Sequence, residues 1–427
     1  MVVAASILTV LLLAGVNIGV CLAISGVAGT MVFTGGGPAG FTMPLIETLE
    51  TTSAYLLIVI PLFMLMGSLA GASGVTADLF HAFYVWLGRV SGGVAVATIA
   101  TCAGMAAITG SSVAVAAAMT RIALPQLLRY RYRPELAVGS IAVGGTLAIM
   151  IPPSITFVLF GIFAEQSIGK LLIAGILPGL LTAALYALKI VVRCRLDPTL
   201  APAGPRFEWR ERWAVLPSVL PFFAIVLAIL LGILLGLWTP VESAAGGVLL
   251  VLALGLARRR LGFRGLAQAF LEAVGTSASV FLVVIGSLIF GAFLALNGFS
   301  EVITRQIVAL ELSSFWLFCL FVAIYFVLGC FMEITSILAL TIPLAMPIVK
   351  AIGWDPIWFG VIVVSLMEVA AVTPPVGLNL YAVKAMAPDI PLRVIFKGAV
   401  PFWMMNLVVI LILYAFPEIA LFLPSLM

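Results

Sequence analysis

Two Pro-Pro pairs, Pro152-Pro153 and Pro374-Pro375, each interrupt an otherwise apolar stretch of the sequence. Proline lacks a backbone donor and frees the carbonyl four residues earlier, and such a carbonyl is a good ligand for a hard cation such as Na⁺. The helix that restarts after the break presents a positive N-terminal end, which suits a carboxylate. Each pair therefore predicts a place where a cation and an anion bind together.

Two short segments between apolar arms are further candidates. Residues 109–112 (Thr-Gly-Ser-Ser) separate one pair of arms, and residues 329–336 separate another. Glu333 is the only charged residue between positions 312 and 349. An ionisable residue inside an apolar run favours a cavity or a transport pathway, although an outside interfacial position is the alternative. The serines of the first segment suit either a hairpin tip or helix packing.

Composition identifies the elements that hold these segments. The chain has 427 residues, of which 64% are hydrophobic and only 9% charged, whereas a soluble protein carries about 25% charged residues. The charge-free runs 214–238, 313–332 and 398–417 each match the roughly 20 residues needed to cross a bilayer. We expect an all-α polytopic membrane protein, with residues 1–33 as its first span.

Catalytic and nucleotide-binding motifs are missing from the sequence. There is no CxxC, HExxH or GxxxxGK[ST] pattern, and His81 is the only histidine. The five cysteines are scattered and mostly in apolar surroundings, where they serve as small hydrophobes. An enzyme, a structural metal site, a resident cofactor and a P-loop ATPase are therefore not supported.

The basic residues predict the orientation of the chain. Lys and Arg accumulate on the cytoplasmic side of membranes, so the net charge of +4 is not a nucleic-acid signal. Even numbers of apolar passes separate the basic clusters, which makes a common cytoplasmic side self-consistent. This count places the N-terminus in the cytoplasm and the C-terminus in the periplasm. The clusters are Arg129 to Arg133, Arg193 to Arg212, Arg258 to Arg264, and Lys384 to Lys397.

An internal repeat relates the two Pro-Pro pairs. An offset of 222 residues matches Pro125 with Pro347 and Pro152-Pro153 with Pro374-Pro375. The charge pattern gives the two copies opposite orientations, and inverted repeats with broken helices are typical of secondary transporters with a midplane site. We expect scaffold helices over 1–75, a first repeat over 76–192, a cytoplasmic loop over 193–213, scaffold helices over 214–297 and a second repeat over 298–427.

The motifs resemble those of one transporter family over nearly the whole chain. The chain is similar to the large membrane subunit, the DctM type, of tripartite ATP-independent periplasmic (TRAP) transporters. The matching motifs are Gly110-Ser-Ser-Val-Ala-Val-Ala-Ala-Ala118, Ile151-Pro-Pro-Ser-Ile155, Gly175-Ile-Leu-Pro-Gly-Leu-Leu181, Thr239-Pro-Val-Glu-Ser-Ala-Ala245 and Thr373-Pro-Pro-Val-Gly-Leu-Asn-Leu380.

The resemblance implies an inverted-repeat elevator transporter with two re-entrant hairpins and two broken helices in a bacterial inner membrane. It implies a small four-span membrane subunit, a periplasmic binding protein that delivers an organic acid such as a C4-dicarboxylate, a keto acid or a sialic acid, and Na⁺ as the coupling ion. The substrate-binding residues it implies are Ser111, Ser112, Ser154, Glu333, Thr335, Gly377 and Asn379. The Na⁺ ligands it implies are Ser111, Ser112, Gly145, Pro152, Glu333, Thr335, Thr373 and Pro374.

Some positions depart from the family pattern or remain open. Val115 replaces a residue that is often polar, and Met367, Glu368 and Ala370 stand where an Asn or Gly often precedes the second Pro-Pro pair; we expect both differences near the site. Arg121 is either a buried partner or a side chain that reaches the cytoplasmic edge. Glu242 follows a proline at a helix start, where a carboxylate stabilises the helix. The alternative function is a stand-alone elevator-type citrate or dicarboxylate carrier.

Overall fold

The computed structural model describes residues 2–202, 204 and 207–427. Over these residues every regular element is a helix, and none is a strand. Eight of the described helices are long and apolar enough to cross a membrane, or nine if the bent pair around Pro152-Pro153 counts as one span. The prediction of an all-α polytopic membrane protein is confirmed.

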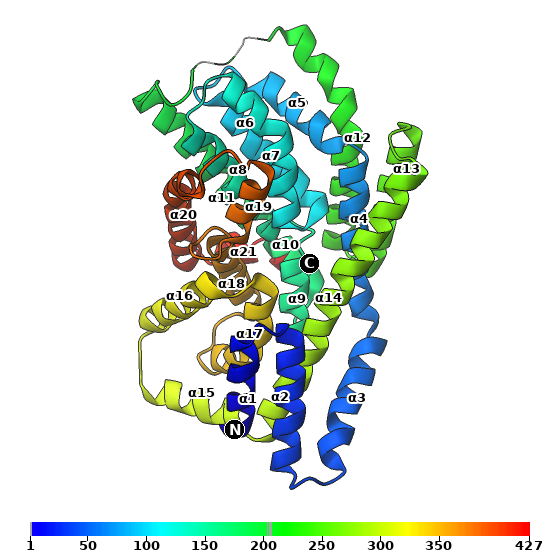
Figure 1. Cartoon of the computed structure of the whole chain (residues 1–427), viewed down its shortest axis with the longest axis vertical. Helices are drawn as coiled ribbons and strands as arrows, with labels where there is room; N and C mark the ends of the chain where they lie inside the picture. The colour runs from blue at the N-terminus through cyan, green and yellow to red at the C-terminus, as the bar shows by residue number, and fades with distance from the viewer. Residues whose placement is uncertain (1, 203, 205–206) are drawn as a thin grey trace.

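The first repeat forms an amphipathic helix, a helical hairpin and a broken span (Figure 1). The hairpin turns at Gly110, whose φ of 57° is a left-handed conformation that glycine adopts without strain. The span breaks at 151–154, where the Pro152-Pro153 bond is cis, and its halves are bent by 41°. The helices are α5 (Val75–Leu87), α6 (Gly93–Thr109), α7 (Ser112–Arg129), α8 (Pro134–Met150), α9 (Ile155–Ala164), α10 (Ile168–Ala174) and α11 (Ile176–Leu196).

The second repeat has the same order of elements. Its hairpin turns at Met332-Glu333, and its broken span is interrupted over 372–377, where the Pro374-Pro375 bond is also cis. Its amphipathic helix buries no residue, whereas that of the first repeat buries six. The helices are α15 (Phe299–Ala309), α16 (Ser314–Phe331), α17 (Ile334–Ala351), α18 (Pro356–Ala371), α19 (Leu378–Met386), α20 (Leu392–Ala415) and α21 (Glu418–Leu421).

The other helices lie outside the two repeats. One of them, α14, has 34 residues and therefore a length of about 51 Å, and it packs on α2, α4 and, in the second hairpin, α17; Figure 1 shows its position. The expected loop 193–213 is shorter than predicted, because α11 and α12 extend into it; its residues 203, 205 and 206 lie outside the described residues. These helices are α3 (Ala39–Ser53), α4 (Val59–Ala72), α12 (Trp209–Leu234), α13 (Pro240–Ala257) and α14 (Phe263–Leu296).

The N-terminal segment is not one span. Residues 2–33 form two helices, α1 (Val2–Leu13) and α2 (Ile18–Phe33), which lie side by side (Figure 1). The chain reverses at Gly15, which has a φ of 73°, and Asn17 then caps α2 by accepting a 2.9 Å hydrogen bond from Gly19 N. The prediction of a single span over 1–33 is wrong because hydropathy does not register a turn inside an apolar run.

This reversal changes the topology derived from parity. The start of α1 lies at the lower end of Figure 1, with α15, whereas the basic loops lie at the upper end. The predicted cytoplasmic N-terminus depends on 1–33 crossing the membrane once, whereas residues 2–33 form two helices. The membrane orientation of the two termini stays a prediction.

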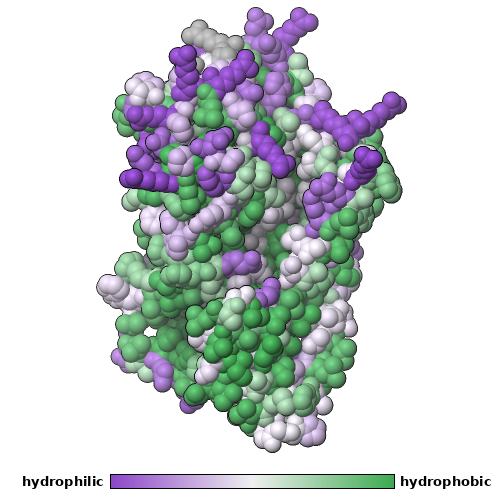
Figure 2. Space-filling model, viewed as in Figure 1, coloured by the Kyte–Doolittle hydropathy of each residue, from purple (hydrophilic) through white to green (hydrophobic). Residues whose placement is uncertain are grey.

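The surface separates into a hydrophilic end and a hydrophobic body. Figure 2 shows hydrophilic residues gathered at the upper end, where α11 and α12 are joined, above a largely hydrophobic surface. Large apolar side chains remain exposed on the described helices, for example Leu249 at 66% and Leu271 at 74%. Such a surface is suited to lipid and to partner helices rather than to water.

Glycines allow two pairs of helices to approach closely. A Cβ on Gly286 of α14 would lie 2.0 Å from the carbonyl oxygen of Gly19 in α2, and a Cβ on Gly139 of α8 would lie 2.3 Å from that of Gly398 in α20. Such close approach is the usual role of small residues between membrane helices. The first crossing fixes the N-terminal hairpin against α14, and the second joins the broken span of one repeat to the last long helix of the other.

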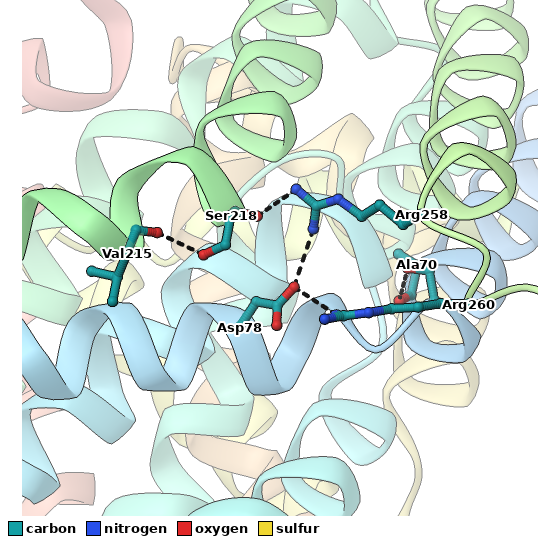
Figure 3. A network of polar contacts seen from close by, with 7 residues as sticks. Ala70, Asp78, Val215, Ser218, Arg258 and Arg260 are labelled. Carbon is teal, nitrogen blue, oxygen red and sulfur yellow. Dashed lines mark hydrogen bonds and ion pairs between the residues drawn. The ribbon is translucent and has the colours of Figure 1, made fainter.

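An ion-pair network anchors α5 to the helices outside the repeats (Figure 3). The Asp78 carboxylate accepts hydrogen bonds from Arg258 at 3.1 Å and Arg260 at 2.7 Å. Arg258 also donates a 2.6 Å hydrogen bond to the carbonyl of Ser218 in α12. One carboxylate therefore connects α5 to the turn between α13 and α14 and, through Arg258, to α12.

Candidate binding site between the hairpin tips

The two hairpin tips, which are more than 200 residues apart in sequence, open into one cavity of about 410 Å³. Ser111 and Ser112 line it from the first hairpin, and Glu333 and Thr335 line it from the second. The cavity is therefore built from both repeats, as the inverted-repeat interpretation predicts.

Helix N-termini converge on this cavity. The first residues of α7, α9, α17 and α19 line it, and so does the N-cap of α2, Asn17. Each helix N-terminus carries about half a positive charge and unpaired N–H groups. No Lys or Arg among the described residues lines the cavity. Any positive potential inside it would therefore come from the backbone.

Glu333 is the one acidic side chain in the cavity lining. It occupies the N-cap position of α17, is exposed, and makes no capping hydrogen bond with its side chain. A free carboxylate here opposes an anion and attracts a cation. Glu333 therefore lies in a cavity, and its place in a transport pathway stays a prediction.

Gly145 and Asn379 meet directly behind the first tip. A Cβ on Gly145 would lie 2.9 Å from the carbonyl oxygen of Ser112 and 3.1 Å from Asn379 Nδ2. Asn379 is fully buried and donates a 3.1 Å hydrogen bond to the Ala142 carbonyl, while its Oδ1 atom has no partner among the described residues. Neither residue lines the cavity, but together they bring the buried Asn379 amide of the second repeat next to the tip of the first.

The break at Pro152-Pro153 has fewer unpaired carbonyl oxygens than the sequence predicts. The Ser154 hydroxyl donates to the carbonyl of Ile149, which is the carbonyl released by Pro153, and it accepts from Phe157 N at 3.4 Å as the cap of α9. Ser154 is fully buried and, like Pro152, does not line the cavity. The structure gives Ser154 a capping role in place of the expected substrate contact.

The second break is likewise internally bonded. Thr373 donates to the Val369 carbonyl at 2.6 Å and accepts from Trp403 Nε1 at 2.7 Å. Gly377 has a φ of 44° and forms the N-cap of α19, and Pro374 is exposed. None of these three predicted residues lines the cavity, whereas the neighbouring Leu378 does.

Several lining residues were not predicted from the sequence. Thr276 and Ser279 of α14 face the tips, and Asn17 enters at the start of α2. Both segments had been assigned to the scaffold. The signal for α14 was the row of polar residues at helical spacing, Gln268, Glu272 and Thr276, in an otherwise apolar helix.

A second cavity of about 700 Å³ adjoins the first and shares Met64, Ser111 and Thr276 with it. It extends along α7 past Ala114, Ala117 and Ala118 to Arg121, the only basic residue that lines either cavity. Arg121 is exposed and its Nε donates to the sulfur of Met386 at 3.2 Å. Arg121 is thus a cavity residue rather than a buried ion-pair partner.

Glu242 stabilises the start of α13, which is the structural role predicted from the sequence. It forms a capping box with Thr239, whose N–H donates to the Glu242 carboxylate at 2.8 Å, while Glu242 N donates to the Thr239 hydroxyl at 3.2 Å. It lines neither cavity.

A sequence model of the family described as the tripartite ATP-independent periplasmic transporter, DctM component, matches residues 5–419. The chain belongs to the DctM family. The match covers both repeats and the helices outside them, so membership extends to the whole described architecture.

Characterised relatives of this DctM-family chain are named as transporter subunits rather than enzymes. It is 33% identical over 406 residues to the C4-dicarboxylate TRAP transporter large permease protein DctM of Pseudomonas aeruginosa, covering 95% of this chain and 93% of that one. It is 27% identical over 373 residues to the sialic acid TRAP transporter large permease protein SiaM of Vibrio cholerae, covering 87% of each.

The fold is also that of a solved transporter. The YdaH transporter of Alcanivorax borkumensis, whose topology was described as unusual, matches with a TM-score of 0.58 at 14% identity, over 90% of this chain and 87% of that one. At this identity the likeness concerns the fold alone.

The two departures from the DctM pattern lie away from the cavity lining. Val115 and Glu368 are both completely buried and line neither cavity. Their side chains pack among helices and do not line either cavity, and the expectation that they lie near the site stays a prediction.

Proposed function

We propose that this chain is the permease subunit of a Na⁺-coupled secondary transporter that imports an organic acid anion by an elevator mechanism. A small four-span membrane subunit and a periplasmic binding protein that delivers the substrate complete the transporter in a bacterial inner membrane. The observation that carries the proposal is the convergence of four helix N-termini and both hairpin tips on one cavity.

The cavity has the size and polarity for a small acid. Its volume of about 410 Å³ lies within the roughly 300–1,000 Å³ of small-molecule sites. Converging N–H groups and the hydroxyls of Ser111, Ser112 and Thr335 supply donors for carboxylate oxygens. Substrate binding is assigned to these three residues and to the backbone of the restarted helices.

A bound Na⁺ would explain why an acidic residue, Glu333, lines a cavity proposed to bind an anion. Glu333 would repel a carboxylate unless a cation lies between them. Behind the first tip, the Ser112 carbonyl lies next to Gly145, and the buried Asn379 has an Oδ1 atom without a partner among the described residues; hard cations prefer such oxygens. Thr373 keeps one lone pair available at the second break.

The substrate class follows from the relatives and the cavity together. One relative is named for C4-dicarboxylates and another for sialic acid, and both kinds of molecule carry a carboxylate. The greater identity to the first relative favours a C4-dicarboxylate, with keto acids and sialic acids as the next candidates.

The two cavities support movement of the binding site. They share residues and together lead from the tips along α7 to Arg121, and α7 ends at Arg129 in the first basic cluster. In an elevator mechanism, displacement of the hairpins and broken spans along α14 would close this route and open the opposite one.

Uptake by reconstituted protein tests the proposal. Proteoliposomes contain this chain, its small subunit and the binding protein encoded with it, and uptake of labelled succinate, pyruvate and sialic acid is measured under inward Na⁺ and choline gradients. We expect uptake of one acid that requires both Na⁺ and the binding protein. Uptake by this chain alone would show instead a stand-alone carrier, and equal uptake under choline would exclude Na⁺ coupling.

A further inference from the structure

A polar cluster without any basic residue lies inside the core formed by the two broken spans. Glu368 of α18 is completely buried, and neither of its carboxylate oxygens has a partner among the described residues. Tyr186 of α11 interacts electrostatically with Glu368 and donates a hydrogen bond to Asn406 Oδ1 of α20. Asn406 Nδ2 is buried and also has no partner there.

The cluster lies at matching positions of the two repeats. Glu368 and Thr146 each precede the first proline of their Pro-Pro pair by six residues. Thr146 is fully buried and interacts with Tyr186. Tyr186 and Asn406 come from α11 and α20, the helices that follow the two broken spans. Glu368 and three polar side chains from both repeats therefore form one cluster, joined through Tyr186.

No cation in the described protein compensates a charge on Glu368. Neither ion pair of the structure includes it, and Tyr186 is the one titratable group found to interact with it. On α11, Lys189 lies about one helical turn from Tyr186, and its Nζ lies 5.6 Å from the centre of the Phe402 ring. The helices packed on α18 carry a few other charged residues, none of which forms an ion pair with Glu368 among the described residues. These charged residues are Glu135 of α8, Lys170 of α10, Lys350 of α17, Lys384 of α19, Arg393 and Lys397 of α20, and Glu418 of α21.

Electrostatics then decides the state of the carboxyl. An ionised carboxylate that is buried without a partner costs several kcal/mol, which a bound proton removes. A metal ion would need several free oxygens, but the Asn406 oxygen already accepts from Tyr186 and the unpartnered atom of Asn406 is a nitrogen donor. The surroundings suit a neutral acid better than a metal carboxylate.

We propose that Glu368 is a proton-binding site of the broken-span core. Its carboxyl is neutral when α8, α18 and α20 are packed as observed, and loss of the proton places an uncompensated charge between the repeats and loosens their packing. This site is separate from the cavity between the tips, and the inference does not rest on the proposed transport function.

Infrared spectroscopy of the full chain in lipid nanodiscs tests this directly. At roughly pH 8, exposed glutamates, which titrate near 4.3, are ionised. We therefore expect the wild-type protein to retain one protonated-carboxyl band. Glu368→Gln, which resembles the neutral acid, should lack that band, and the exposed control Glu418→Gln should keep it. The wild-type measurement stands by itself if the variant does not fold.

Two results would overturn the proposal. The protonated band can be missing from the wild-type spectrum, which would show that Glu368 is ionised. It can also disappear when NaCl replaces choline chloride, which would show a metal-cation site. As a second readout, raising the pH should lower the melting temperature of the wild-type protein but not that of Glu368→Gln. Equal shifts in both would contradict a role for Glu368.

Discussion

The indole nitrogen of Trp403 donates a 2.7 Å hydrogen bond to the hydroxyl of Thr373. The same hydroxyl donates to the Val369 carbonyl, so it joins α20 to the end of α18 at the second break. Thr373 therefore has a structural role in addition to the Na⁺ contact proposed for it.

Substitutions at this pair separate the two roles. Thr373→Val removes the hydroxyl, and we expect the Na⁺ concentration for half-maximal uptake to rise about tenfold, which corresponds to 1.4 kcal/mol. Thr373→Ser should preserve it. Trp403→Phe should lower stability by about 1 kcal/mol with little change in Na⁺ dependence. An equal Na⁺ effect from Trp403→Phe would indicate that Thr373 positions the break and does not bind the ion.

Glu333 supplies the negative charge of the cavity. Glu333→Gln should weaken Na⁺ binding by about tenfold or more, because the cation loses its one charged neighbour there. The readout is the Na⁺ dependence of succinate uptake in proteoliposomes. Glu301→Gln, an exposed change in α15, is the matched control and should leave that dependence unaltered. An unchanged Na⁺ requirement in Glu333→Gln would rule out its role.

The Asp78 network predicts a loss of stability. Asp78→Asn leaves Arg258, whose side chain is 19% exposed, without a charged partner, and we expect a cost of about 1–3 kcal/mol in unfolding. Arg260 is 47% exposed, so Arg260→Gln should cost less than about 1 kcal/mol. Denaturant unfolding of the purified chain measures both. A larger effect at Arg260 would contradict this ranking.

The contact between Gly139 and Gly398 leaves no room for a side chain. Gly139→Ala should push α8 from α20 and destabilise the protein by about 1–3 kcal/mol or more. Gly246→Ala is the control, because nothing lies within 4 Å of a Cβ there and alanine favours a helix by about 0.5–1 kcal/mol. Thermal unfolding should shift in opposite directions for the two variants.

The sequence predicted the parts of the site that depend on local chemistry. Proline removes a helical hydrogen bond and favours a break, and each Pro-Pro pair marks one, whereas the single prolines Pro125 and Pro347 stand inside continuous helices. Gly110 with its following serines fits a tight tip, so both breaks and both tips could be located from residue types. Ser111, Ser112, Glu333 and Thr335 were placed in the cavity for the same reason.

The remaining parts depend on packing between distant segments. The turn at Gly15 carries no charge or proline, so 1–33 resembled a single span. The rotation of α14 about its own axis decides whether Thr276 and Ser279 face the tips or the lipid. This rotation depends on the neighbouring helices and cannot be predicted from the sequence of α14 alone. For Ser154 the sequence suggested contact with a ligand. In the structure its hydroxyl instead donates a hydrogen bond to the Ile149 carbonyl within the break.

The positive character of the cavity is a property of the peptide backbone. A point mutation can remove a hydroxyl or a carboxylate at the tips, but it cannot remove the dipoles of four helix ends. If the cavity binds an organic acid as proposed, variation in its lining would change the fit to a particular acid and leave these backbone dipoles in place. Affinity for anions in general would then be inherited with the fold, and selectivity among them would depend on a few side chains.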